Sequence, residues 1–470
     1  MGGNLGDGYG QWWRQNEGGI IFSTNQFPYD WWTAFSENMG TLKSYQRGTA
    51  QPFTQVRILR FLYDLVIPTF RVDTNRILLG GFSMGGSGTS MWGIRSGHIF
   101  SHTIAWVGVH SPKESPYGAS FIDVFGDSTW HVLYSNEALG EFGYHVVSAE
   151  DSIRVWDYWS NMDFLAENPT QETPWMTYSN GSNDNSIGWP QAWKYTQAMI
   201  QTKRSFNFTW GTSGHSQTAW LIDGNTTNSG LDFRKNQSLP AFTNCSIDGD
   251  LGSNYSNSSL AGTLNRYFKW DVSTVVDESE QWNMTIWLID VAAYESCTVN
   301  ITPRRLQNLE HGPNSTYHWE LTDQEGYTLL NGNAITDSNG LFTILTVPIS
   351  KTKRTLKVSC ISCTSTSTRI IKKSYQDEFI VETYPNPFNP VIHIKIRNSN
   401  LQTQQAQFNI YDIAGKCVLA GTSGHGKTVS LQNGINADFR WDASNQPSGV
   451  YILKIFRGDK STSKKILLLR

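Results

Sequence analysis

The stretch Arg76-Ile77-Leu78-Leu79-Gly80-Gly81-Phe82-Ser83-Met84-Gly85-Gly86 decides the fold of the first half of this chain. Its apolar run predicts a buried strand, and a helix-like segment follows at residues 89–94. Ser83 therefore stands in a strand-to-helix turn with the pattern Gly-x-Ser-x-Gly, which predicts a nucleophile. The backbone N–H of Met84, at the helix start, would then face the oxygen that becomes negative during attack. The alternative is a glycine-rich turn without catalysis.

Strands and helices alternate on both sides of this turn up to about residue 228. Further apolar runs predict strands at residues 20–23, 103–109, 175–178 and 206–210, and helical spacing predicts helices at residues 56–66 and 192–203. Such alternation favours a mostly parallel sheet covered on both faces. Residues 113–170 fit no such unit, so we expect an insertion or cap there.

A serine nucleophile needs a general base and an acid that orients the base. In a strand–turn–helix arrangement of this kind the chain order is serine, acid, histidine. His215 follows the last predicted strand, where the carboxyl ends of parallel strands should form the site. Asp184 follows the strand at residues 175–178, and a turn or helix-cap aspartate is its alternative role. We predict His215 as base and Asp184 as acid, with Asp157 and Asp163 as rival acids.

Residues 1–220 resemble the secreted α/β-hydrolase esterases of the polyhydroxybutyrate-depolymerase and feruloyl-esterase group. The matching pieces are Val72-Asp73-Thr74-Asn75-Arg76-Ile77, Gly81-Phe82-Ser83-Met84-Gly85-Gly86, Asn183-Asp184, Gly188-Trp189, Trp210 and Gly214-His215. The resemblance implies an α/β-hydrolase fold and a catalytic triad of Ser83, Asp184 and His215. We expect this mechanism to need no cofactor, and we predict no metal site.

The family also carries a His-Gly…Gly-Gly loop after an early strand, which supplies a second oxyanion N–H. Only Met1-Gly2-Gly3-Asn4 can correspond to the end of that loop, which would make Gly3 the second donor. The strands before the loop are missing, and the amino terminus has neither the basic start nor the apolar run of a signal peptide. We therefore hypothesise that the hydrolase domain is amino-terminally truncated, because Met1 is an internal methionine.

Tryptophans next to the predicted acid and base suggest a carbohydrate-linked ester as the substrate. Trp189 and Trp210 flank Asp184 and His215, and further tryptophans occupy the first loops, namely Trp12, Trp13, Trp31 and Trp32. Indole rings stack on sugar and phenolic rings, although core packing is the default for each of them. We expect Trp189 and Trp210 to bind substrate, with plant cell-wall polysaccharide esters as the first class and aliphatic polyesters as the second.

Two other functions remain open from the sequence. A serine peptidase of the prolyl-oligopeptidase type shares the Gly-x-Ser-x-Gly turn and the chain order of the triad. A non-catalytic surface binding protein with a degenerate hydrolase domain is the alternative from a different class.

Residues 229–361 alternate polar and apolar side chains with the period of half-buried strands, as in Met284-Thr285-Ile286-Trp287-Leu288-Ile289. This pattern predicts a β-sandwich domain, which would act as a carbohydrate-binding or spacer module. We interpret residues 337–340 as a tight turn rather than a calcium loop. Cys360-Ile361-Ser362-Cys363 lacks a partner motif for zinc or redox chemistry, so we expect a strand-end disulfide or two inert thiols.

The last segment follows a polar linker at residues 362–375. Residues 376–470 contain the proline-rich run Tyr384-Pro385-Asn386-Pro387-Phe388-Asn389-Pro390 near their start and end with Lys464-Lys465-Ile466-Leu467-Leu468-Leu469-Arg470. This segment resembles the carboxyl-terminal sorting domain recognised by type IX secretion in Gram-negative bacteria. The resemblance implies an immunoglobulin-like sandwich, a secreted or cell-surface destination and the secretion machinery as a partner. An ordinary immunoglobulin-like spacer is the alternative.

Length and charge exclude other classes of protein. At 470 residues the chain predicts about three domains. Its 37 Lys and Arg against 40 Asp and Glu leave a net charge of −3, which argues against nucleic acid as a partner. No run approaches the ~20 apolar residues of a bilayer-spanning helix, so we predict no membrane span.

Overall fold

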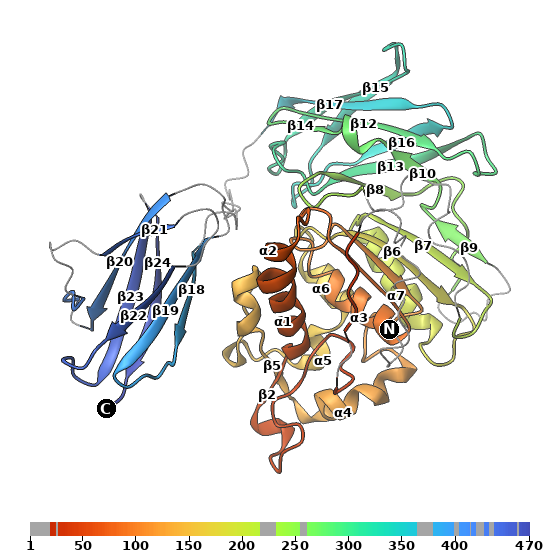
Figure 1. The fold of residues 1–470 in the computed structure, drawn as a ribbon. Helices are drawn as coiled ribbons and strands as arrows, with labels where there is room; N and C mark the ends of the chain where they lie inside the picture. Colours follow the sequence, from red (N-terminus) through yellow and green to blue (C-terminus); the bar gives the residue numbers. More distant parts are fainter. Residues whose placement is uncertain are drawn as a thin grey trace. The chain divides into compact units, whose positions relative to one another are not determined.

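The computed structural model describes residues 19–24, 27–216, 232–253, 261–363, 379–398, 404–413, 415–419, 427–431, 437–457 and 460–470. The chain divides into two compact units, Met1–Ser367 and Thr368–Arg470. The first unit holds an α/β region followed by a β-rich region, and the second unit consists of strands in the part that is described (Figure 1).

The α/β region is built on a five-stranded sheet with the order β3-β4-β6-β7-β9. Its strands are β3 (Leu78–Phe82), β4 (His102–Trp106), β6 (Trp175–Gly181), β7 (Phe206–Gly211) and β9 (Gly262–Leu264). The first four run parallel and only β9 is antiparallel, as the alternation of strands and helices predicts. Strand β9 carries the sheet past residue 228, where the sequence placed the end of this domain.

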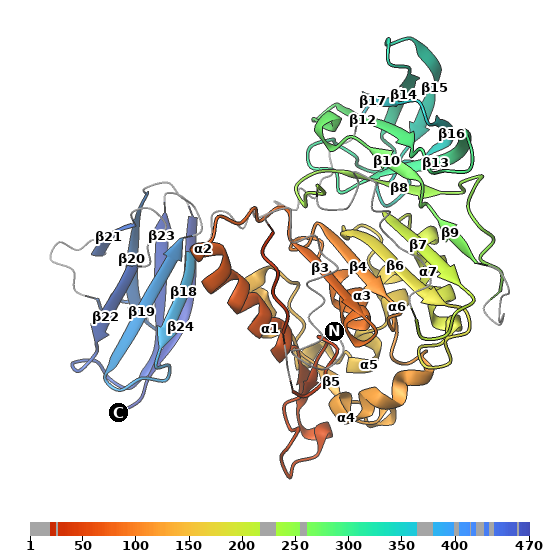
Figure 2. The same ribbon diagram turned by 45° about the vertical axis from the view of Figure 1, so that its right-hand side comes forward.

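Helices pack along this sheet and place its loops (Figure 2). They are α1 (Phe53–Arg60), continued by a π-helical turn (Phe61–Val66) and α2 (Ile67–Thr69), then α3 (Met84–Gly93), α6 (Asn161–Glu167) and α7 (Trp189–Gln201). Proline stands in the first turn of α7, where its missing N–H costs nothing. The predicted helices therefore form, each with ends that differ from the prediction by a few residues.

The residues between β4 and β6 form short elements rather than another strand–helix unit. They include α4 (Ile122–Phe125), α5 (Val155–Tyr158) and β5 (Leu133–Tyr134), which joins β1 (Phe35–Ser36) and β2 (Thr49–Gln51) in a small separate sheet. The strand predicted at residues 20–23 does not form. Ile20 and Ile21 are 51% and 40% exposed in irregular backbone, because no described strand pairs with this segment.

The β-rich region packs two sheets around one core, as a sandwich does. One sheet contains β8 (Leu239–Thr243), β13 (Ser296–Arg304) and β16 (Ile344–Ser350). The other contains β10 (Phe268–Trp270), β11 (Val276–Asp277), β12 (Gln281–Leu288), β14 (Thr316–Thr322), β15 (Thr328–Ile335) and β17 (Arg354–Ser362). Trp175 of β6 and Phe233 belong to the same core, so the sandwich and the α/β region share apolar packing.

Two local predictions for the β-rich region are confirmed. The carboxylate of Asp337 accepts the backbone N–H groups of Asn339 and Leu341, which makes a tight turn. Cys360 and Cys363 form a disulfide at the end of β17. The buried indoles Trp270, Trp282 and Trp319 pack inside the sandwich rather than presenting a face to sugars.

The second unit has two sheets around a separate apolar core. One sheet has the order β18 (Phe379–Tyr384), β19 (Val391–Asn398) and β22 (Ala437–Asp442). The other has the order β21 (Lys427–Leu431), β20 (Gln404–Asp412), β23 (Gly449–Arg457) and β24 (Lys460–Leu468). The basic end of the chain is thus part of the last strand of a small sandwich. Among the residues described in either unit, no helix is long and apolar enough to cross a bilayer.

Candidate active site

Ser83 occupies a sharp turn between β3 and α3. Its backbone has φ 54° and ψ −111°, a conformation that residues with a side chain rarely adopt. The turn is held at both ends, because the Ser83 N–H donates to the carbonyl of Trp106 at 2.9 Å and the Ser83 carbonyl accepts from Ser87 N–H at 2.8 Å. The turn thus places the hydroxyl at the carboxyl end of the sheet and the N–H of Met84 at the helix start, where N–H groups have no partner within the helix.

Glycines on three segments allow this turn to pack closely against the sheet. A Cβ on Gly81 would overlap the backbone of Gly85, and a Cβ on Gly86 would overlap the carbonyl oxygen of Trp106. A Cβ on Gly108, beyond the end of β4, would overlap the backbone of Gly86. The glycines of the motif are therefore needed for the approach of α3 to β3 and β4.

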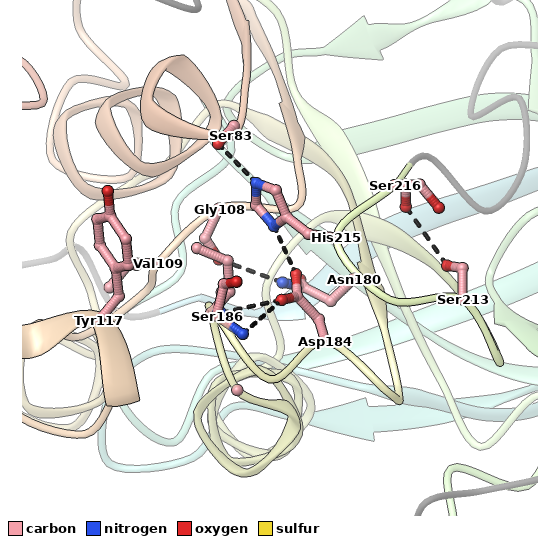
Figure 3. A network of polar contacts seen from close by, with 12 residues as sticks. Ser83, Gly108, Val109, Tyr117, Asn180, Asp184, Ser186, Ser213, His215 and Ser216 are labelled. Atoms are coloured by element: carbon pink, nitrogen blue, oxygen red, sulfur yellow. Dashed lines mark hydrogen bonds and ion pairs between the residues drawn. The ribbon is translucent and has the colours of Figure 1, made fainter.

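His215 connects Ser83 to Asp184 (Figure 3). Its Nε2 lies 2.7 Å from Ser83 Oγ, and its Nδ1 lies 2.7 Å from Asp184 Oδ2. A charged carboxylate only accepts hydrogen bonds, so Nδ1 carries the proton and Nε2 presents its lone pair to the hydroxyl. The three side chains come from loops after β3, β6 and β7, whose carboxyl ends meet at one edge of the parallel sheet.

The surroundings of Asp184 leave one oxygen for the histidine. Oδ1 accepts the backbone N–H groups of Ser186 and Ile187 at 2.9 and 3.0 Å, which leaves Oδ2 for His215. The Asp184 side chain is 1% exposed and that of His215 is 32% exposed. A buried carboxylate thus orients an imidazole that solvent can reach.

Two contacts join the loop after β6, which carries Asp184 (the acid loop), to the loop after β7, which carries His215 (the base loop). Neither contact is evident from the sequence. The side-chain amide of Asn183 donates to the carbonyl of Thr212 at 2.7 Å, and its backbone N–H donates to the carbonyl of Ser213 at 3.1 Å. A Cβ on Gly181 would overlap the Ser213 carbonyl, so the loops meet backbone to backbone. Residues 179–185 show only a turn signal in the sequence, which does not predict which loop they contact.

The rival acids lie elsewhere. Asp157 pairs with Lys113 and Arg154 at 3.1 and 2.6 Å, and Asp163 pairs with Lys113 at 2.5 Å. Both carboxylates therefore stabilise the segment between β4 and β6 instead of facing His215.

The tryptophan predictions need correction. Trp189 and Trp210 are 3% and 1% exposed and pack around Phe208 in the core beneath α7, so their rings are not available to a substrate. Trp31 is 6% exposed and stacks on Phe121, with ring centroids 4.1 Å apart. These rings are buried because removing the apolar area of an inward-facing indole from water is favourable in free energy.

Other predicted site residues lie outside the described part of the chain. They are Gly3, Trp12 and Trp13. Tyr117, which the sequence does not single out, is 37% exposed and stands beside the triad in Figure 3. The neighbouring Ser115 hydroxyl donates to the carbonyl of Ile187 at 2.7 Å, which ties the Tyr117 segment to the acid loop.

Comparison with known families matches one part of the chain. Residues 382–469 match the family described as a secretion system C-terminal sorting domain. This match confirms the predicted sorting domain and indicates that the protein is secreted or attached to the cell surface. No curated protein matches the chain.

Solved structures resemble the chain only remotely. An S-formylglutathione hydrolase from Agrobacterium tumefaciens matches with 15% identity and a TM-score of 0.26, over 34% of this chain and 50% of its own. An S-formylglutathione hydrolase from Staphylococcus aureus matches with 15% identity and a TM-score of 0.23, over 35% of this chain and 55% of its own. The chain spans about half the length of each of these hydrolases.

Proposed function

We propose that this protein is a secreted serine hydrolase that cleaves carboxylic esters through Ser83, His215 and Asp184. The observation that carries the proposal is the continuous pair of 2.7 Å contacts from the Ser83 hydroxyl through His215 to the buried carboxylate. A hydroxyl aligned with an imidazole lone pair, beside a helix start, has the parts that acyl transfer requires.

In the proposed reaction, Ser83 Oγ attacks the ester carbonyl while His215 Nε2 accepts its proton. The imidazolium that forms is stabilised by Asp184, which keeps the Nδ1 proton in place. The Met84 N–H stabilises the negative oxygen of the tetrahedral intermediate. His215 then protonates the leaving alcohol, and a water activated by the same imidazole releases the acyl group from Ser83.

The sorting domain directs this hydrolase to substrates outside the cytoplasm, which supports a polymer-linked ester as the substrate. Esters on polysaccharides are the first class we propose, and aliphatic polyesters are the second. Since Trp189 and Trp210 are buried, we assign the aromatic substrate contact to Tyr117, whose ring meets the edge of Trp31 with centroids 6.1 Å apart.

Labelling with a fluorophosphonate probe tests the nucleophile directly. We expect the full chain to be labelled and Ser83→Ala to lose both the label and about 10⁴-fold or more of kcat/KM on a p-nitrophenyl acyl ester. Ser128→Ala, which changes an exposed serine in the segment between β4 and β6, should retain both. Absence of labelling in the folded wild type would favour a non-catalytic binding protein.

Parallel assays with an aminoacyl-anilide distinguish an esterase from a peptidase. We expect ester turnover that depends on Ser83, with anilide turnover lower by orders of magnitude. Efficient anilide cleavage without ester cleavage would instead assign the triad to a peptidase.

A further inference from the structure

Cys245 lies just after strand β8, and Cys297 lies in the neighbouring strand β13 of the sandwich. Strands β8 and β13 are antiparallel, with Thr243 opposite Asn300. The pairing continues beyond β8, because Ser246 N–H donates to the Thr298 carbonyl at 2.9 Å and Ser246 Oγ accepts from Thr298 N–H at 3.0 Å. Cys245 directly precedes Ser246 in the chain, and Cys297 directly precedes Thr298. Each cysteine is therefore next to one member of this hydrogen-bonded pair.

The two side chains are buried in the sandwich core, where the Asp248 carboxyl also faces the Cys245 thiol. Cys245 is 8% exposed and Cys297 is 5% exposed, and both belong to the sandwich core. Both are thiols in this structure. The hydrogen bond with Cys297, together with burial, raises the pKa of the Cys245 thiol. Because both side chains are buried, we expect oxidation to take place while the chain folds, before the core closes.

The destination of the protein sets the redox conditions for this pair. The sorting domain indicates that the chain leaves the cytoplasm, and adjacent cysteines in exported proteins are normally oxidised. Cys360 and Cys363, in the same β-rich region, already form a disulfide.

We propose that Cys245 and Cys297 form a second disulfide in the exported protein. Two S–H bonds break and one S–S bond forms, and the two electrons and two protons pass to a protein disulfide that is reduced to a dithiol. The bond would join residues 52 positions apart in the sequence (297 − 245). It would fasten the segment just after β8 to β13, the middle strand of the same sheet.

Counting thiols in the exported full-length protein tests the proposal. The protein is denatured without reductant, alkylated with iodoacetamide and digested, and the peptides are identified by mass. We expect alkylation at Cys417 alone, and a cross-linked pair of peptides that contains Cys245 and Cys297. Alkylation at Cys245 and Cys297 before reduction, or a cross-link from either of them to another cysteine, would overturn the proposal.

A stability measurement provides an independent readout. Reductant should lower the Tm of the wild type by about 5 °C or more, since it opens the loop between the two strands. The double variant Cys245→Ala/Cys297→Ala should lose most of that response to reductant, whereas Cys417→Ser should keep it. A double variant that responds to reductant as strongly as the wild type would contradict the proposal even if its own Tm is lower.

Discussion

At the scale of single residues, the site depends on how few hydrogen-bonding choices each group has. One carboxylate oxygen of Asp184 accepts two backbone N–H groups, so the other oxygen is left to accept from His215. His215 then has one ring nitrogen left for Ser83. Asp184 therefore orients His215, and His215 in turn presents its remaining ring nitrogen to Ser83.

Asn183 should act as a positioning residue for His215, the proposed general base. Asn183→Ala removes the 2.7 Å bond to the Thr212 carbonyl, which holds the loop that carries His215. We expect kcat on an acyl ester to fall roughly 10–100-fold with KM little changed, because a small displacement of the imidazole lowers the rate of proton transfer. Steady-state kinetics together with thermal unfolding would check this. An unchanged kcat, or a large loss of stability that accounts for the defect, would contradict a positioning role.

The buried His110 should make stability depend on pH. It is fully buried, with Nε2 3.0 Å from Asn180 Oδ1 and its ring stacked on Tyr195. Burial lowers the pKa of His110 from its ordinary value of 6.5 to about 4, although the hydrogen bond with Asn180 opposes the shift. Between these two pH values the unfolded chain binds a proton at His110 that the folded chain excludes. The contribution of His110 to the free energy of unfolding is therefore fully present above pH 6.5 and is lost as the pH falls toward 4.

The loss should reach up to about 3 kcal/mol at pH 4, measured by urea unfolding at a series of pH values. His110→Gln removes this titrating group and should reduce the loss of stability between pH 6.5 and 4, even if it lowers stability at pH 7. Part of the dependence should remain, because burial also lowers the pKa of His98 to about 4. If the variant and the wild type lose the same amount between pH 6.5 and 4, His110 is not responsible.

At the scale of elements, the approach of α3 to the sheet decides whether the nucleophile can be presented. The helix begins directly after the strained Ser83, so it can reach β3 and β4 only if the facing positions have no side chain. The motif is thus a packing requirement for a helix and two strands as much as a catalytic signature.

Gly86→Ala should disrupt this packing. The added Cβ would overlap the Trp106 carbonyl, which also accepts the Ser83 N–H, so helix and strand must separate. We expect a loss of about 2–4 kcal/mol in the free energy of unfolding and slower fluorophosphonate labelling of the protein that remains folded. Gly19→Ala is the matched control, because a Cβ at Gly19 meets no atom within 4 Å. Equal stability of the two variants would show that the close approach is not needed.

At the scale of the first unit, buried arginines join the α/β region to the sandwich. Arg305, just after β13, is 3% exposed and donates to the carbonyls of Thr173, Arg234 and Ser101 at 2.8, 3.1 and 3.4 Å. Arg304 contacts Glu172 at 3.2 Å. Since β6 begins two residues after Thr173 and leads to Asp184, the sandwich supports the segment that enters the acid-bearing strand.

Arg305→Met should therefore destabilise the whole first unit. The methionine keeps apolar volume but leaves the Thr173 carbonyl without its donor. It also takes one donor from the carbonyls of Ser101 and Arg234, which keep the N–H groups of Trp175 and Gln237. We expect a cost of about 1–3 kcal/mol. Urea unfolding followed by the fluorescence of the buried tryptophans measures the change. Lys357→Met, which removes an exposed cation from the same region, should be nearly neutral. If Arg305→Met matches this control, the guanidinium does not hold the two regions together.

Features that depend on local pattern can be predicted from the amino-acid sequence. Strand and helix periodicity are properties of neighbouring residues. The apolar run before Ser83 and the glycines around it therefore predict a strand, a turn and a helix, and the order of Asp184 and His215 predicts the loops that carry them. Parallel strands then bring the loop ends to one edge, so the three side chains could be named before their distances were known. The sorting domain was evident for the same reason.

Which faces are covered and which loops touch depends on contacts between elements that are distant in sequence. Trp189 is the first residue of α7 and Trp210 lies in β7, and the local sequence does not show which way either ring faces. Their burial follows from their packing around Phe208. The contact of Asn183 with Thr212, the addition of β9 to the sheet and the place of Trp175 in the sandwich core join residues far apart in sequence. Such contacts arise from how elements pack against one another, and that packing has no signature in any short stretch of the chain.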